Sequence, residues 1–190
     1  MLADDQRPKA VLDAACGSGL FTIGLAMLCK QDRFIGLDRS VGMIRVAVRQ
    51  ARRYRFQHMA FHIGEVQAMP FHDACFDVVV VAGLFPNIND WTLVLREFHR
   101  VLKSGGQLVI VEFDRVAMSR LGRLFFWGMI SVYKLVSCGF RQFRFAEDWN
   151  IEASTVDQQA LTSSLLAEGY DLSPMERLAN HVVLPCRKGS

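Results

Sequence analysis

The chain has 190 residues, of which 51% are hydrophobic and 22% are charged, and its formal net charge is +3. This length suits one domain, 1–190, with one sizeable core, and the composition excludes a disordered chain. A charge this small does not by itself indicate a polyanionic partner, and five cysteines without a C-x-x-C pair are typical of reduced thiols in a cytoplasmic protein.

Strand-like and helix-like segments alternate along the chain. Strands are predicted near Ala10–Ala15, Arg33–Asp38, His58–Ile63, Phe76–Val81 and Gln107–Phe113. Helices are predicted near Leu20–Lys30, Val41–Tyr54, Trp91–Leu102, Val116–Phe140 and Thr155–Glu168. The final segments, Tyr170–Leu178 and His181–Arg187, predict an antiparallel pair. The alternation predicts the α/β class, with a doubly wound, mostly parallel sheet of seven strands and a C-terminal antiparallel hairpin.

The most informative stretch is Val11–Thr22, where an apolar run ends in Asp13 and a small-residue loop leads into a helix. Gly17 and Gly19 let the backbone approach a ligand closely, and the start of a helix presents free N–H groups. Asp38, 25 residues after Asp13, ends the next strand, where an acid can hold ribose hydroxyls. The pattern predicts a nucleoside-containing cofactor.

Two classes of cofactor use this arrangement. A dinucleotide fingerprint has three glycines, whereas Thr22 stands at the third position here. Asp13 would repel a pyrophosphate but suits a cofactor that carries an ammonium and a sulfonium. A nicotinamide oxidoreductase and a simple glycine turn both stay open as alternatives.

The segment from Asp13 to Gly19, with Ala15 at its first small position, resembles motif I of class I S-adenosylmethionine (SAM) methyltransferases. Three later segments resemble further motifs of these enzymes, in the family's order. They are Gly64–Phe71 (G-D-x-x-x-L-P-F), Phe76–Val79 (F-D-x-V) and Arg100–Gly106 (R-V-L-K-P-G-G). The resemblance implies a Rossmann-like fold, SAM as the cofactor and S-adenosylhomocysteine as the product.

A narrower resemblance is to the C-methyltransferases of ubiquinone and menaquinone biosynthesis (methyltransferase type 11). Gly83–Asp90 is similar to their G-L-R-N-V-x-D, with one insertion and no arginine, and Leu108–Arg115 is similar to L-V-x-L-E-F-S-K. Their Y-x-Y-L-x-x-S-I segment is not clearly present. The resemblance implies a small lipophilic acceptor, such as a quinone precursor.

Other acceptors and roles stay open. One alternative is a lipid-headgroup or natural-product N/O-methyltransferase. Another is a SAM-binding partner subunit without catalysis, because only about ten residues precede the first strand and the chain is expected to be short there. The fourth strand does not lead into N/D-P-P-Y, which counts against nucleic acid as a substrate. A homo-oligomer is also left open.

The resemblance also implies which residues bind the cofactor. They are Asp13, Ala15, Gly17, Gly19, Asp38, Arg39, Met43, Glu65, Val66, Gly83 and Leu84. No metal is expected. The candidates for a general base are Glu112, Asp114 and His181, and then His62 and His72; the alternative for each is an ordinary structural or surface role.

Two features indicate contact with a membrane surface. Arg45, Arg49, Arg52 and Arg53 recur at helical spacing, with Arg55 just beyond, and could meet anionic lipid or nucleic acid or simply form a solvated helix face. Leu121–Phe140 is apolar but has only ten uncharged residues between Arg123 and Lys134, too few to span a bilayer. Within a helical cover expected over 116–168, this segment is interpreted as a lid, a membrane contact or a core cover.

Overall fold

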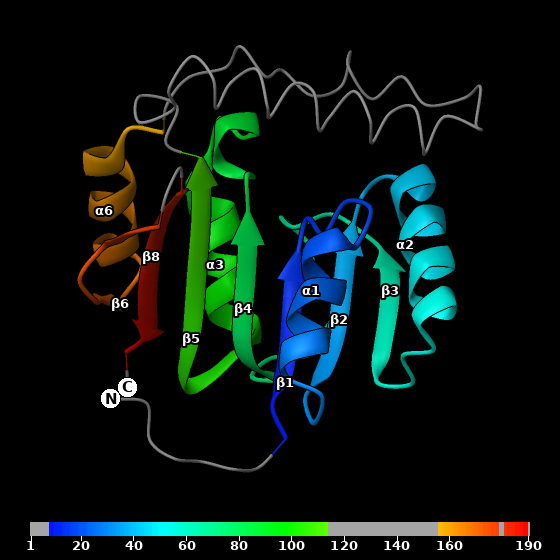
Figure 1. Ribbon diagram of the computed structural model, residues 1–190. Coiled ribbons are helices and arrows are strands. Elements are labelled where there is room, and N and C mark those ends of the chain that lie inside the picture. The colour runs from blue at the N-terminus through cyan, green and yellow to red at the C-terminus, as the bar shows by residue number, and fades with distance from the viewer. Residues whose placement is uncertain (1–7, 114–155, 179–180, 190) are drawn as a thin grey trace.

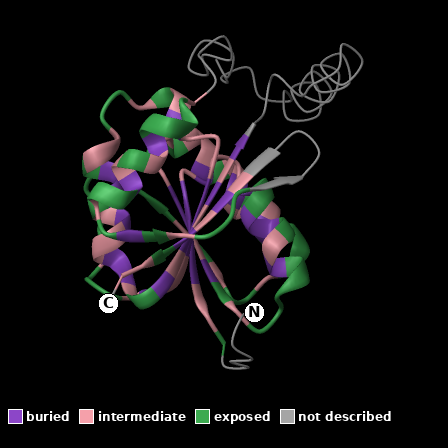
Figure 2. Ribbon diagram, turned by 90° about the vertical axis from the view of Figure 1, so that its left-hand side faces the viewer, coloured by how far each residue is buried: buried purple, intermediate pink, exposed green. Residues whose placement is uncertain are grey.

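The computed structural model describes residues 8–113, 156–178 and 181–189. Helices lie on both faces of a twisted central sheet, which Figure 2 shows edge-on. The strands are β1 (Ala10–Ala14), β2 (Arg33–Asp38), β3 (Met59–Ile63), β4 (Phe76–Ala82), β5 (Leu102–Phe113), β6 (Tyr170–Leu172), β7 (Glu176–Leu178) and β8 (His181–Lys188). The helices are α1 (Leu20–Leu28), α2 (Val41–Tyr54), the 3₁₀ turn η1 (Phe85–Asn87), α3 (Trp91–Val101) and α6 (Gln158–Ala167).

The sheet has the strand order β3-β2-β1-β4-β5-β8-β6, and β7 pairs with β8 beside this path. Strands β1 to β5 are parallel, and β8 runs antiparallel to β5 (Figure 1). The predicted doubly wound sheet with an antiparallel closing pair is therefore confirmed.

The strand predicted over Tyr170–Leu178 is divided into β6 and β7. Leu172 lies opposite Cys186 and Glu176 opposite Val183, so three residues between β6 and β7 face only two residues of β8. Pro174 lies in the gap between them, and proline cannot donate a hydrogen bond to a sheet.

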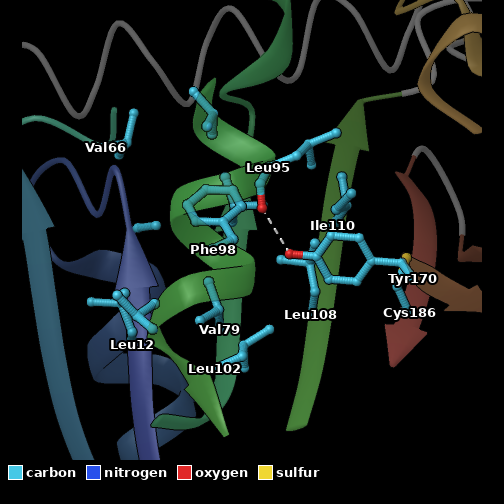
Figure 3. Close-up of a cluster of buried hydrophobic side chains, with 14 of the residues drawn as sticks. Leu12, Val66, Val79, Leu95, Phe98, Leu102, Leu108, Ile110, Tyr170 and Cys186 are labelled. Carbon is cyan, nitrogen blue, oxygen red and sulfur yellow. Dashed lines mark hydrogen bonds between the residues drawn. The ribbon is translucent and has the colours of Figure 1, made fainter. Parts of the chain in front are cut away.

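Two apolar layers cover the two faces of the sheet. The larger one lies under α3 and α6 and includes Leu12, Val79, Leu108 and Phe98, each with no exposed surface. Residues that alternate with these along the strands, such as Val11 and Val80, face α1 instead. In Figure 3, the Tyr170 hydroxyl donates to the Leu95 carbonyl at 3.0 Å, which satisfies the polar atom of a buried ring.

Arg100 ties the segment after β3 to α3. Its guanidinium bonds Glu97 at 2.7 and 2.8 Å and the carbonyls of Met69 and Phe71 at 3.1 and 2.8 Å. Glu97 in turn accepts the Met69 N–H at 2.8 Å. Two segments that resemble family motifs are therefore held together by charge-assisted hydrogen bonds.

Several predictions differ from the structure or fall beyond it. α1 ends at Leu28 instead of Lys30, and α6 begins at Gln158 because Asp157 caps it by accepting two backbone N–H groups. Most of the predicted cover 116–168, with its apolar segment Leu121–Phe140, lies outside the described residues. None of the helices that can be described is long and apolar enough to cross a membrane.

Candidate functional site

The site predicted from the sequence lies where the strand order reverses. β2 and β3 extend from one side of β1, whereas β4 and β5 extend from the other. The loops that follow β1 and β4 therefore leave the same edge of the sheet, at its carboxyl ends, next to each other (Figure 1). Open α/β sheets bind ligands at such a switch point.

The loop after β1 has a left-handed backbone conformation at three of its small residues. Ala15, Gly17 and Gly19 all have positive φ, at 62°, 54° and 76°. A Cβ on Gly17 would meet no atom within 4 Å, so the space beside it is open to a ligand. A Cβ on Gly19 would lie 2.9 Å from the Cβ of Ala47 on α2, so this glycine is required for packing.

Asp38 joins three segments at the end of β2. Its carboxylate accepts the Gly17 N–H and the Ser40 N–H, both at 2.8 Å, and its carbonyl accepts the Gly64 N–H at 3.1 Å. The predicted neighbours Asp38 and Gly17 are therefore in direct contact. A carboxylate has about four lone-pair directions, so Asp38 keeps capacity for further donors.

Asp13 is a buried acid beneath the same loop, with 1% of its surface exposed. The Thr22 hydroxyl donates to it at 2.5 Å. Burial raises the pKa of Asp13 to about 7; the hydrogen bond from Thr22 opposes this shift, and the nearby charge of Asp38 adds to it. Thr22 was not predicted as a partner of Asp13, although its place three residues after Gly19 put it in the first turn of the helix.

The first turn of α1 has no side chain that caps its backbone N–H groups. The side chains of Ser40, Asp90 and Asp157 cap α2, α3 and α6, but the N-cap of α1 is Gly19, which has no side chain to cap it. Among the α-helices that the structure describes, α1 alone lacks a side-chain cap. Its first N–H groups and the positive end of its dipole suit an anionic group such as a carboxylate.

The loop after β4 is held by Glu112 near the end of β5. Glu112 accepts the Phe85 N–H at 3.2 Å and is only 8% exposed. Burial raises its pKa to about 7, and hydrogen bonds from the backbone of Phe85 and Leu84 oppose this shift. Gly83, with φ of 66°, donates to the Val111 carbonyl at 2.9 Å, so Gly83 and Leu84 lie beside Glu112.

The other predicted cofactor residues lie around Asp38. Arg39 and Glu65 are exposed and Met43 is half-buried. The Val66 side chain is buried in the core under α3, so only its backbone is available to a ligand.

The structure does not gather the candidate bases. His62 and His72 are exposed, and His62 lies on β3, far across the sheet from Glu112 on β5. The backbone of His181 pairs with Phe113, but its side chain and all of Asp114 lie outside the described residues. Of the three whose side chains the structure describes, Glu112 is therefore the one that is both buried and beside the β4 loop. Within the described ranges, no cluster of three or more His, Cys, Asp or Glu side chains could hold a metal ion.

Comparison with known proteins decides the family, because residues 5–177 match the methyltransferase domain. The chain belongs to this methyltransferase family. A demethylmenaquinone methyltransferase of Thermus thermophilus is 30% identical to it over 175 residues, which cover 90% of this chain and 78% of that protein. The methyltransferase is of class I, its fold is Rossmann-like, and its cofactor is SAM.

Solved structures agree on the fold. A SAM-dependent methyltransferase of Methanosarcina mazei has a TM-score of 0.70 at 22% identity, covering 97% of this chain and 94% of that one. A geranyl diphosphate C-methyltransferase of Streptomyces coelicolor, bound to S-adenosylhomocysteine, has a TM-score of 0.68 at 13% identity, covering 97% and 76%. The match to the methyltransferase domain sets the nicotinamide alternative aside.

Proposed function

We propose that this methyltransferase transfers the methyl group of SAM to a small lipophilic acceptor of the quinone-precursor type, at carbon. The single observation that carries the proposal is the buried Glu112, tied to the β4 loop at the switch point. The similarity to a demethylmenaquinone methyltransferase over 90% of the chain supports the choice of acceptor. A lipid-headgroup or natural-product N/O-methyltransferase stays as the alternative.

The residues present fit SAM. The open space at Gly17 admits a ligand close to the backbone, and the uncapped start of α1 suits the carboxylate of the methionine part. The carboxylate of Asp38 favours a cationic ligand and has lone pairs left for ribose hydroxyls. When bound, SAM supplies a methyl group already activated by its sulfonium, so the protein mainly positions the reactants and excludes water.

Glu112 is the group proposed to accept a proton. Methylation at an aromatic carbon forms a carbon–carbon bond, and the ring must then lose one proton to regain its aromatic system. A carboxylate in a water-poor environment, with a pKa near 7, is matched to this task at neutral pH. The N–H of Phe85 holds one of its oxygens in place, which fixes the carboxyl group beside the β4 loop.

Turnover with a panel of acceptors tests the proposal. The purified chain is incubated with SAM and either a demethylated hydroquinone (the reduced form of the quinone, kept without oxygen), a lipid-headgroup amine or a phenol, and S-adenosylhomocysteine is measured. We expect turnover with the hydroquinone and a product methylated at carbon. Turnover only with the amine or at phenol oxygen would contradict it, and binding of SAM with no S-adenosylhomocysteine from any acceptor would indicate a non-catalytic subunit.

A further inference from the structure

The net positive charge of this molecule lies at one end of the sheet. From Arg39 to Gly64 the chain has six arginines and two histidines, and it has no aspartate or glutamate. The other 16 basic and 19 acidic residues leave the rest of the chain with a net charge of −3. This segment forms α2 and the edge strand β3, so its charge gathers at one side (Figure 1). Such an asymmetric field orients a protein toward a polyanion.

Four arginines form an exposed stripe along α2, which we call the arginine face. They are Arg45, Arg49, Arg52 and Arg53. The buried side of the helix is made of Ile44, Ala47 and Ala51. At 3.6 residues per turn, the arginine face points away from this buried side and out from the sheet.

Three of these arginines carry charges that are not balanced within the described part of the protein. α2 contains no acid, and no acidic side chain of the described residues pairs with Arg45, Arg52 or Arg53. By contrast, Arg96 and Arg100 on α3 both pair with carboxylates. Like charges three and four residues apart on a helix destabilise it, so the arrangement favours an anion supplied from outside.

We infer that the arginine face docks the methyltransferase on an anionic lipid bilayer. Two exposed aliphatic side chains lie on the same two elements: Val41, at the start of α2, is 46% exposed, and Ile63, at the end of β3, is 54% exposed. Aliphatic side chains gain free energy by entering the boundary between headgroups and acyl chains, whereas they gain none against the phosphates of a nucleic acid. Lipid is therefore favoured over nucleic acid as the partner.

The position of this surface suggests that docking brings the active site to a membrane-dissolved acceptor. This part of the inference rests on the proposed lipophilic acceptor. Ile63 is paired in register with Asp38, and α2 begins three residues after Asp38. The docking surface therefore begins beside the cofactor site, at the carboxyl ends of the strands. A molecule docked this way holds its reacting edge close to the bilayer in which a lipophilic acceptor dissolves.

The test compares two triple variants of the full chain with the same net charge. Arg45→Gln, Arg52→Gln and Arg53→Gln remove charge from the arginine face, and Lys30→Gln, Arg96→Gln and Arg187→Gln remove it from exposed sites elsewhere. Binding is measured by sedimentation with vesicles of phosphatidylcholine alone or mixed with phosphatidylglycerol, without SAM or acceptor. Each arginine near an anionic surface contributes about fivefold to the partition coefficient. The variant with three substitutions on α2 should therefore bind the mixed vesicles about 100-fold more weakly, and the control variant less than about threefold more weakly.

A variant with lysine at the same three α2 positions keeps the charge and should restore binding. SAM affinity and thermal melting report folding, and added salt should release the wild type from the vesicles. Equal losses in both triples, binding that salt does not weaken, or α2-dependent binding to single-stranded RNA without vesicle binding would each overturn the inference. Vesicle binding without turnover of a hydroquinone would instead contradict the proposed acceptor and leave the docking surface intact.

Discussion

The backbone N–H of Gly17 donates to the carboxylate of Asp38 across 2.8 Å, joining the loop after β1 to the end of β2. The same carboxylate accepts the Ser40 N–H at the start of α2. Asp38 therefore fixes the shape of the loop before any ligand binds. Its proposed contact with ribose would use the lone pairs that remain, so one side chain both builds the site and binds within it.

We expect Asp38→Ala to lower SAM affinity by roughly 10–150-fold, the effect of losing about 1.5–3 kcal/mol of charge-assisted hydrogen bonding. Isothermal titration measures the change, and Asp171→Ala, at an exposed position on β6, is the matched control. Wild-type affinity in a folded Asp38→Ala variant would show that the ribose lies elsewhere.

The two loop glycines should respond differently to the same substitution. Gly17→Val places a branched side chain in open space beside the loop, but at a φ of 54° that L residues rarely adopt, so the protein should lose some stability, still fold and fail to bind SAM. Gly19→Val would press against Ala47 and Phe61, at 2.9 and 3.0 Å from the new Cβ, so it should lower the melting temperature much more. Circular dichroism and titration with SAM separate the two effects. Retained binding in the Gly17 variant would place the ligand away from this loop.

The alternation of apolar runs and amphipathic segments was enough to predict the sheet. A nearly continuous apolar run such as Phe76–Val81 has few polar residues to face solvent. This pattern is typical of a central parallel strand that is covered on both faces. The spacing of Asp13, Gly17 and Asp38 also predicted a common site, because the carboxyl ends of β1 and β2 meet at one edge.

Other parts of the site depend on tertiary contacts that no local pattern encodes. Nothing near Thr22 in the sequence shows that its hydroxyl reaches back to Asp13, nine residues earlier on a different element. Likewise, the sequence left five candidate bases, and among the three whose side chains the structure describes, burial and the Phe85 N–H distinguish Glu112. The register of β8 against two short strands also depends on packing, which is why β6 and β7 were merged.

Glu112→Gln tests the proposed proton acceptor. In the wild type, kcat should rise as the pH passes through about 7, because Glu112 must lose its proton before it can accept one from the acceptor. The glutamine still accepts the Phe85 N–H but cannot take a proton. We expect kcat to fall by about 10²–10⁴-fold and the rise with pH to disappear, with SAM affinity nearly unchanged. A variant that keeps both the rate and its pH dependence would leave Glu112 a purely structural role.

Asp13 should make stability depend on pH. Its folded pKa is about 7 and its ordinary value is 3.8, so between these values the folded state binds more protons than the unfolded state. The contribution of this group to the free energy of unfolding therefore falls as the pH rises from about 4 to 7, by up to about 4 kcal/mol. Asp13→Asn removes this contribution, so the variant should gain stability relative to the wild type across that window. Urea denaturation at a series of pH values measures it, and parallel curves for the two proteins would contradict it.

The anchoring of β1 has a consequence for how the chain folds. β1 precedes both of its neighbours in the sequence, and the Asp77 carboxylate that accepts the Ala10 N–H at 2.9 Å comes 67 residues later. The central strand therefore cannot complete its pairing until β4 has formed, and closing so long a loop costs entropy before any contact repays it. We expect β1 to be protected from hydrogen exchange late in refolding, together with β4 rather than with β2.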